Sequence, residues 1–293
     1  MVGQTPLLSV IDKMIEDNSF PRFSIIQGAD GSGKNLMAKY ITNKLGAMSA
    51  SMDNSVDSIR NAIKRAYEPT KKPLVFVFRH AEDMSQAARN ALLKVTEEPP
   101  NNVYFILTVV NDNAIPDTLK SRAGVFHMLP YSNMDLSQYL FEKGKSDMRY
   151  ADADKKKIAL EICDTPGDID VLMDNNPIKL YDFVEKVVDN IGTVSVSNAL
   201  KITDSLALTD KDEGKFDLVL FLRAVIMWYC KDLKDSVTHM STDDLNKMAK
   251  VVMSTKESIN MITSVRGINK RNVFDIWVLE MRNILDGDED GSF

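Results

Sequence analysis

The sequence has few of the features that mark secreted or membrane proteins. It contains two cysteines, Cys163 and Cys230, among 293 residues, too few for a disulfide framework or a four-cysteine zinc site. Its longest apolar runs, such as 74–78 and 224–230, are far shorter than the roughly 20 residues that a membrane-spanning helix requires. No basic-then-apolar leader opens the chain. We therefore expect a cytoplasmic protein with no membrane association.

The chain also lacks the basic surplus of a free-standing nucleic-acid binder. It has 36 Lys and Arg residues against 42 Asp and Glu residues, for a formal net charge of −6, whereas the neutralisation of phosphates requires a basic face. The imbalance is uneven. Residues 1–130 carry 15 basic and 13 acidic side chains, residues 131–180 carry 7 and 10, and residues 181–293 carry 14 and 19. Only the N-terminal segment has a positive balance, which is compatible with DNA contact as part of a larger assembly.

The first 131 residues do contain an alternation of strand and helix patterns. Apolar runs predict buried strands at 23–27, 74–78, 103–110 and 124–129. Apolar residues at helical spacing predict helices at 5–17, 34–45, 55–67, 85–95 and 116–122. Strands that alternate with helices indicate an α/β module with a mostly parallel sheet covered on both faces.

The strand patterns end near residue 132, and the rest of the chain is helical. Three short helices are expected at 135–144, 153–163 and 167–174, and five longer ones at 180–191, 194–208, 216–233, 242–265 and 270–285. Pro177 separates the two groups. We therefore predict three domains, namely the α/β module at 1–131, a small helical domain at 132–178 and an all-α domain at 179–293. Residues 286–293 are expected to form a frayed acidic tail.

A glycine-rich loop joins the first predicted strand to the next helix. Its sequence, Gly28-Ala-Asp-Gly31-Ser-Gly33-Lys34-Asn35, follows the phosphate-loop pattern GxxxxGK[ST] as far as the lysine. In such loops the glycines let backbone N–H groups surround the phosphates, and the lysine reaches the outer ones. Asn35 stands where the pattern needs a hydroxyl for Mg²⁺. Two alternatives stay open here: a loop that still binds ATP or ADP, and a vestigial loop that keeps only its shape.

The carboxylates that an ATPase needs for magnesium and for water activation are missing directly after the 74–78 strand. Arg79 and His80 follow that strand instead. Glu82 and Asp83 come later, where we expect them to face into the next turn. His80 is best explained as a surface or capping residue. We therefore expect no efficient intrinsic ATP hydrolysis, and Mg²⁺ would lack its usual ligands.

Several segments together resemble one protein family. Residues 88–100, with the sequence ARNALLKVTEEPP, resemble the NALLKTLEEPP segment of bacterial DNA polymerase III clamp loaders. Residues 2–4 resemble the family's N-terminal box beside the adenine site, residues 56–64 resemble its IDxVRxxIK helix, and residues 121–123 stand where the family has Ser-Arg-Cys. Residues 269–279 are more weakly similar to the last helix of the collar domain. The resemblance implies a RecA-like AAA+ module followed by a small helical lid and an all-α collar for oligomerisation.

Within this family the chain resembles the delta-prime subunit more than the gamma/tau ATPase. The resemblance implies that a gamma/tau protein would have an intact Asp-Glu pair and four zinc cysteines, and this chain has neither. Residues 167–170 line up with the family's GDxR sensor segment, so Asp170 replaces an arginine that would touch the γ-phosphate. A carboxylate there would repel a triphosphate. The implied partners are gamma/tau-type ATPase subunits, a delta-type subunit, the sliding clamp and primed DNA.

The resemblance also assigns roles to basic residues. Arg122 stands at the arginine finger that projects into a neighbouring subunit's ATP site, a task that suits a permanently charged guanidinium; the alternative is a surface ion pair. Arg60 and Lys64 lie four apart on a helix that in the family faces DNA phosphates, and a solvated helical face is the alternative. Weaker candidates for DNA contact are Arg89 and Lys94.

These observations predict a non-hydrolysing subunit of a DNA polymerase clamp loader. It would supply Arg122 in trans and help to load the sliding clamp on primed DNA during replication. Two alternatives stay open. The first is an active AAA+ ATPase, which Lys34 favours and Asn35, Arg79 and Asp170 oppose. The second is a divergent AAA+ adaptor that loads a helicase.

Overall fold

The computed structural model describes residues 1–111, 113, 115–207, 215–236, 240–264 and 267–286. Their contacts divide the chain into two compact units. The first unit comprises Met1–Leu136 together with Thr165–Gly167, and the second comprises Ser137–Asp164 together with Asp168–Phe293. No helix among the described residues is long and apolar enough to cross a membrane. The predicted tail at 286–293 lies, beyond its first residue, outside the described residues.

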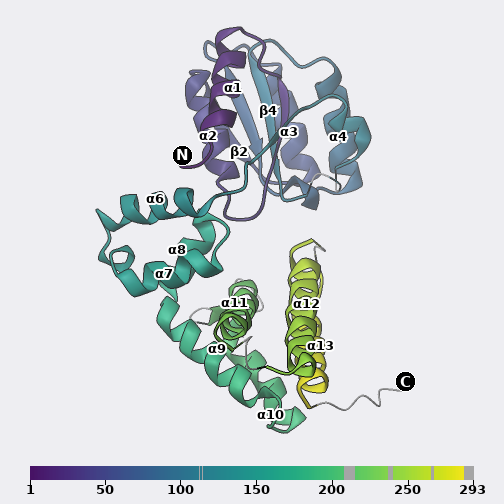
Figure 1. Ribbon diagram of the computed structural model, residues 1–293. Helices are drawn as coiled ribbons and strands as arrows, with labels where there is room; N and C mark the ends of the chain where they lie inside the picture. Colours follow the sequence, from purple (N-terminus) through teal and green to yellow (C-terminus); the bar gives the residue numbers. More distant parts are fainter. Residues whose placement is uncertain (112, 114, 208–214, 237–239, 265–266, 287–293) are drawn as a thin grey trace. The chain divides into compact units, whose positions relative to one another are not determined.

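The first unit is built on a five-stranded parallel sheet (Figure 1). Its strands are β1 (Phe23–Gln27), β2 (Met48–Met52), β3 (Leu74–Phe78), β4 (Val103–Val109) and β5 (Gly124–His127). They lie in the order β2-β3-β4-β1-β5. The prediction of a parallel α/β sheet is therefore confirmed, and the carboxyl ends of the central strands meet at one edge, where ligands bind in open α/β folds.

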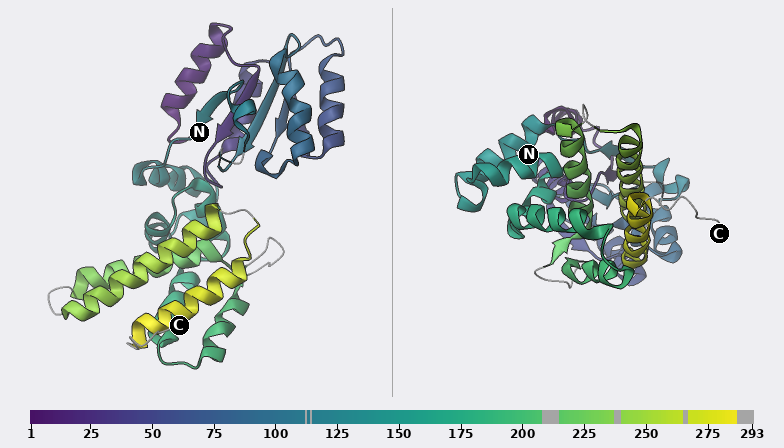
Figure 2. Two further views of the ribbon diagram at one scale, coloured as in Figure 1. Left: turned by 90° about the vertical axis from the view of Figure 1, so that its right-hand side faces the viewer. Right: turned by 60° about the horizontal axis from the view of Figure 1, so that its bottom comes forward.

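Helices cover both faces of this sheet (Figures 1 and 2). One face packs against α1 (Thr5–Glu16) and α2 (Lys34–Lys44), with Ile11, Met37 and Ile41 buried among its apolar side chains. The other face packs against α3 (Val56–Ala66) and α4 (Gln86–Glu97), with Ile59 and Leu92 fully buried. A short helix, α5 (Asp117–Lys120), and a 3-10 turn, η1 (Ala81–Asp83), complete the connections. Two apolar layers therefore hold the sheet rigidly in place.

The strand β2 was not predicted from the sequence. Its residues, Met-Ser-Ala-Ser-Met, include no β-branched or aromatic side chain, and all five are exposed or half-buried. The strand lies at the sheet edge and pairs on one side with β3, from Met48 opposite Leu74 to Met52 opposite Phe78. Residues 48–52 thus form a strand because their backbone pairs with the buried strand β3, since strand preference depends strongly on context.

The second unit is helical. It contains most of α6 (Asn133–Gly144) and α8 (Pro166–Asp174), and all of α7 (Ala153–Ile162), α9 (Pro177–Ile191), α10 (Val196–Leu200), α11 (Leu218–Ser236), α12 (Thr242–Ser264) and α13 (Lys270–Asp286). Its 3-10 segments are η3 (Met148–Tyr150) and η4 (Lys201–Ser205). The long helices α12 and α13 lie side by side (Figure 2). This confirms the helical C-terminal region, whereas the boundary at residue 178 stays a prediction.

Aromatic side chains form the centre of this helical core. Trp277 is fully buried and stacks on Phe274 with ring centroids 5.1 Å apart, and its edge meets Phe221 at 5.9 Å. The indole Nε1 donates a hydrogen bond of 3.0 Å to Thr255 Oγ1, so the buried N–H has a partner.

One predicted helix of this region is wrong. The spacing at 194–208 predicts one continuous helix, but α10 ends at Leu200 and η4 follows it. The chain then enters β6 (Leu206–Ala207), which pairs in parallel with β7 (Phe216–Asp217). Pairing with a segment farther along the chain therefore overrides the local helical pattern.

Candidate nucleotide site and arginine finger

The phosphate-loop sequence forms the turn between β1 and α2, as predicted. Gly33 is the N-cap of α2 with a φ of 88°, and Gly31 has a φ of 74°. Both angles lie in the left-handed region that glycine adopts without strain. A Cβ added at Gly28 would come within 2.7 Å of Met128 Cβ. The glycines therefore keep the loop's shape for identifiable steric reasons.

Lys34 is the first residue of α2, and its side chain is turned back onto the loop. The side chain is 7% exposed. Its Nζ donates hydrogen bonds to Gly28 O at 2.7 Å and Ala29 O at 2.9 Å, and lies 3.5 Å from Asp30 Oδ1. Burial lowers the pKa of Lys34, and the carboxylates of Asp30 and Glu82 oppose that shift. The ammonium is thus engaged within its own loop, and it would have to release these bonds to reach a phosphate.

A cavity of about 250 Å³ opens at this loop. It is lined by Asp30, Gly31, Gly33, Lys34, Asn35, Leu36, His80 and Thr108. Binding sites for drug-sized ligands are typically about 300–1,000 Å³. The cavity at the loop is therefore slightly smaller than such sites.

The residues that would hold Mg²⁺ do not fit that ion. Asn35 offers an amide in place of a hydroxyl, and the first two residues after β3 are Arg79 and His80. Among the described residues, no group of three or more His, Cys, Asp or Glu side chains could hold a metal ion. The site thus combines the backbone shape of a phosphate loop with a poor donor set for magnesium.

Glu82 is the residue whose position differs most from the sequence-based expectation. It was expected to face into the turn after β3, but η1 buries its side chain to 6% exposure. Its Oε1 accepts a hydrogen bond of 3.2 Å from Val110 N, just after β4, and lies 3.9 Å from His80 Nδ1. Glu82 also acts electrostatically on Lys34. It therefore belongs to the surroundings of the loop, and His80, whose side chain is 44% exposed, lines the cavity.

The loop is also braced by segments that lie far away in the sequence. Gly167 N donates a hydrogen bond of 3.1 Å to Gly31 O, and a Cβ at Gly167 would come within 2.3 Å of Gly31 Cα. The Tyr131 hydroxyl donates to Ser32 O at 2.7 Å. The buried amide of Gln4 exchanges two hydrogen bonds of 2.9 Å with the backbone of Leu129. The first two contacts hold the loop itself, and the third fixes the segment that leads to Tyr131. The loop sequence alone does not reveal them.

Arg122 follows α5 and is exposed. Its Nη1 donates to Thr118 O at 2.6 Å, and its Nη2 donates to Glu97 Oε1 at 2.7 Å. The helix beneath it is anchored by Leu119, which is fully buried. The ion pair proposed as the alternative for Arg122 is therefore present in this chain, and it leaves the guanidinium at the surface. The role as a finger in trans stays a prediction.

The four candidates for DNA contact differ in their surroundings. Arg60 and Lys64 are both exposed on α3, and Arg60 Nη1 lies 3.8 Å from Asp57 Oδ1 one turn earlier. Lys94 is exposed on α4. Arg89 is half-buried and donates to Glu82 O at 2.9 Å. Arg89 is thus used within the module, and the other three present charge to solvent.

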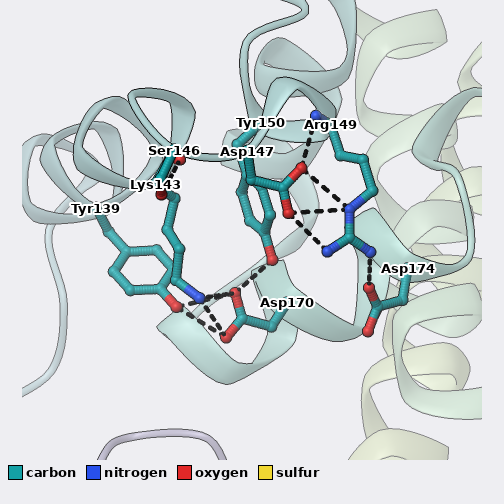
Figure 3. A network of polar contacts seen from close by, with 8 residues as sticks. All are labelled: Tyr139, Lys143, Ser146, Asp147, Arg149, Tyr150, Asp170 and Asp174. Atoms are coloured by element: carbon teal, nitrogen blue, oxygen red, sulfur yellow. Dashed lines mark hydrogen bonds and ion pairs between the residues drawn. The ribbon is translucent and has the colours of Figure 1, made fainter.

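Asp170, at the predicted sensor position, is held by side chains of the second unit (Figure 3). Its carboxylate accepts hydrogen bonds from Tyr139 at 2.8 Å and Tyr150 at 2.7 Å, and Lys143 Nζ lies 3.4 Å away. Burial and the Asp170 charge both raise the pKa of Tyr150. The carboxylate therefore has a structural role, because its contacts link α8 to α6 and η3.

Comparisons with known proteins agree with this architecture. The family described as "DNA polymerase III, delta subunit" matches residues 49–132. The tau subunit of DNA polymerase III from Bacillus subtilis is 23% identical over 279 residues, which cover 78% of this chain and 49% of that protein. The delta' subunit from Yersinia pestis is 35% identical over 75 residues, 25% of this chain and 22% of that protein.

The solved structure of the RuvB Holliday junction branch migration motor from Thermotoga maritima has a TM-score of 0.50 at 15% identity, and the match covers 90% of this chain and 85% of that one. This likeness shows the AAA+ fold alone. The chain spans about half to two thirds of the length of the curated relatives that it matches over most of its own length. The matching family model, the DNA polymerase III relatives and the fold together support a relationship to the bacterial-type clamp-loader AAA+ proteins.

Proposed function

We propose that this chain is the delta-prime type of clamp-loader subunit, one that does not turn over ATP efficiently and acts on a neighbouring ATPase. The observation that carries the proposal is a contrast within one module. The loop holds Lys34 on its own carbonyls, in a cavity that the Asn35 amide and the His80 imidazole also line, whereas Arg122 is exposed with its guanidinium oriented. The match to a delta' relative supports the same reading.

In this role Arg122 would stabilise the transition state of a neighbour's reaction. A guanidinium is permanently charged and can spread several N–H donors over phosphate oxygens. An arginine finger supplied in trans contributes on the order of 10³–10⁵ in rate in related phosphoryl transfers. The partners would be gamma/tau-type ATPase subunits, a delta-type subunit and the sliding clamp. The lid (132–178) and collar (179–293) would serve assembly, and DNA contacts of Arg60, Lys64 and Lys94 would position primed DNA without reading its sequence.

One observation favours the alternative, an active ATPase. Glu82 is buried close enough to Lys34 to influence its charge, so one carboxylate is available near the loop. A single carboxylate without a hydroxyl at position 35 leaves the magnesium coordination incomplete. We therefore rank this function second.

The test measures ATP turnover by the purified chain alone, with and without primed DNA, and compares it with Lys34→Ala. We expect the same background rate for both proteins. Turnover that DNA stimulates and that Lys34→Ala abolishes would overturn the proposal in favour of an active ATPase. Intact mass spectrometry of the native complex would test the partners, and a complex without clamp-loader subunits would contradict them.

A further inference from the structure

Glu97 lies at an electrostatically unfavourable place, directly beside Arg122. It is the last residue of α4, and Glu98 follows as the C-cap. The C-terminus of a helix carries a partial negative charge, so an acidic side chain in the last turn is unfavourable there. A residue that breaks a local rule is more informative than one that follows it, since such exceptions concentrate at functional sites.

The partner of Glu97 is the guanidinium that we assign as the finger. Glu97 Oε1 accepts from Nη2 at 2.7 Å, and Thr118 O accepts from Nη1 at 2.6 Å. A guanidinium has five N–H donors in one plane. Two acceptors on different elements therefore define the orientation of that plane, and three donors remain for an oxyanion.

Both acceptors are held by rigid parts of the first unit. The C-terminal half of α4 is anchored by Leu92 and Val95, which are at most 1% exposed. Beyond the helix, Arg22 Nη1 donates to Pro99 O at 3.2 Å and to Asn101 Oδ1 at 3.1 Å. The carbonyl of Thr118 belongs to α5, which Leu119 anchors. A group held from rigid elements is placed more accurately than one on a loop.

We propose that Glu97 is a positioning residue, which orients Arg122 for the γ-phosphate of a nucleotide bound to an adjacent subunit. The inference rests on the proposed function, because it needs Arg122 to act in trans. Glu97 itself does not touch the phosphate. By holding the guanidinium in advance, it reduces the conformational entropy that the long arginine side chain loses when the neighbouring site closes. Placement matters because a shift of about 1 Å in a catalytic group can reduce the rate on the order of 100-fold.

An ordinary surface ion pair predicts a different outcome. Glu97 is 56% exposed and Arg122 35% exposed, and pairs of this kind contribute little to stability. If the pair were only structural, removal of Glu97 would alter the thermal stability slightly and leave the chemistry of the assembly unchanged. The ATPase rate of the assembly therefore distinguishes a positioning role for Glu97 from a purely structural ion pair.

The experiment uses the loader reconstituted from this chain and its gamma/tau-type ATPase, delta-type and clamp partners. DNA-stimulated ATPase is measured for wild type, Glu97→Ala, Glu97→Gln, Arg122→Ala and the double variant Glu97→Ala/Arg122→Ala. Glu98→Ala is the matched control, since it removes an exposed carboxylate from the next position. Thermal melts of each variant establish that it is folded, and Glu97→Gln keeps a hydrogen-bond acceptor of the same shape.

We expect Glu97→Ala to lower kcat at the served site roughly tenfold, with KM for ATP unchanged, and Glu97→Gln to lower it by a smaller factor. Glu98→Ala should match wild type, and Glu97→Ala should have no further effect once Arg122 is removed. The inference is overturned if Glu97→Ala behaves like Glu98→Ala, if it accelerates turnover, or if it lowers the rate equally in both backgrounds. If any of these results is found while Arg122→Ala still lowers the rate, the inference about Glu97 fails and the proposed function stands. If the Arg122→Ala loader is as fast as wild type, the inference and the proposed function are both overturned.

Discussion

The phosphate loop and the finger region belong to one rigid module, yet their chemical groups are arranged in opposite ways. At the loop, the cation Lys34 is buried on backbone carbonyls, and the neighbouring positions offer an amide and an imidazole. At the proposed finger, the cation Arg122 is exposed, and its two contacts orient it without covering it. The loop thus holds its cation on its own carbonyl groups, while Arg122 presents its charge to solvent.

Under the proposed function, this difference means that an AAA+ module keeps the shape of its phosphate loop without using that loop for ATP turnover. Interlocking contacts with distant segments hold the loop conformation, so shape alone is weak evidence for turnover. Substitutions at the loop should therefore change stability, and substitutions at the finger should change the rate of a partner. The predictions below test this division, from the largest expected effect to the smallest.

The largest effect is expected for Arg122→Ala in the reconstituted loader. ATP turnover at the site that this subunit serves should fall by about 10³-fold or more, while the melting temperature of the chain stays within a few degrees. Arg122→Lys should rescue little, because an ammonium lacks the planar set of donors. Lys120→Ala is the control, since it removes a nearby cation that pairs with Asp117 within α5; an equal loss of rate in that variant would contradict the assignment.

The next effect concerns the glycine contact behind the loop. Gly167→Ala would place a Cβ 2.3 Å from Gly31 Cα, so the backbone must move. We expect about 3 kcal/mol of destabilisation in chemical denaturation. Gly46→Ala is the matched control, because Gly46 has a φ of 60° but nothing within 4 Å of the added Cβ, and backbone strain alone costs roughly 1–2 kcal/mol. Equal losses in the two variants would show that the glycine contact does not brace the loop.

Gln4→Ala should cost about 2 kcal/mol. The substitution removes the side chain that pairs with both Leu129 N and Leu129 O, and buried groups without partners are expensive. Gln86→Ala provides the comparison, since Gln86 is exposed and its side-chain amide donates to Asn90 Oδ1 at the surface. Denaturation midpoints that do not distinguish the two variants would argue against a bracing role for Gln4.

The smallest effect is a pH dependence at the helices beside the loop. A hydrogen bond from Tyr40, with a further contribution from Lys44, lowers the pKa of Asp12. A carboxyl group whose pKa is lowered by folding stabilises the protein above its unfolded value, about 3.9, and this contribution is lost as the pH falls below that value. Asp12→Asn should therefore lower stability by less than about 1 kcal/mol at pH 7, and the difference should shrink steadily as the pH falls below the unfolded value and through the lowered folded one. A difference between the two proteins that does not shrink on acidification would contradict the assignment.

Much of the module could be predicted from sequence because its signals are local. Buried apolar runs identified four of the five strands, and Ser55 and Ser85, which cap α3 and α4 with their side chains, mark helix starts. The edge strand β2 was missed, because its pairing with β3 is a tertiary effect. The break after Leu200 was missed for the same reason, since β6 pairs with a segment ten residues farther on.

The sequence predicted the individual motifs of the site but not the contacts that join them to distant residues. The spacing of Gly28, Lys34 and Asn35 identified the loop, but no local pattern revealed that Gly167 and Tyr131 brace it. Glu82 was expected to face into the turn after β3, and its burial beside Val110 depends on a tertiary contact that the local sequence does not reveal. The pairing of Glu97 with Arg122 joins residues 25 positions apart, and only the exceptional acid at a helix C-terminus could have drawn attention to it.

The central claim is that this subunit acts through Arg122 and not through Lys34. The most direct test is the DNA-stimulated ATPase rate of one reconstituted loader carrying either Lys34→Ala or Arg122→Ala in this chain. We predict that the Lys34→Ala loader keeps the wild-type rate and that the Arg122→Ala loader loses turnover at the site it serves. A Lys34→Ala loader that loses as much activity as the Arg122→Ala loader would contradict the account.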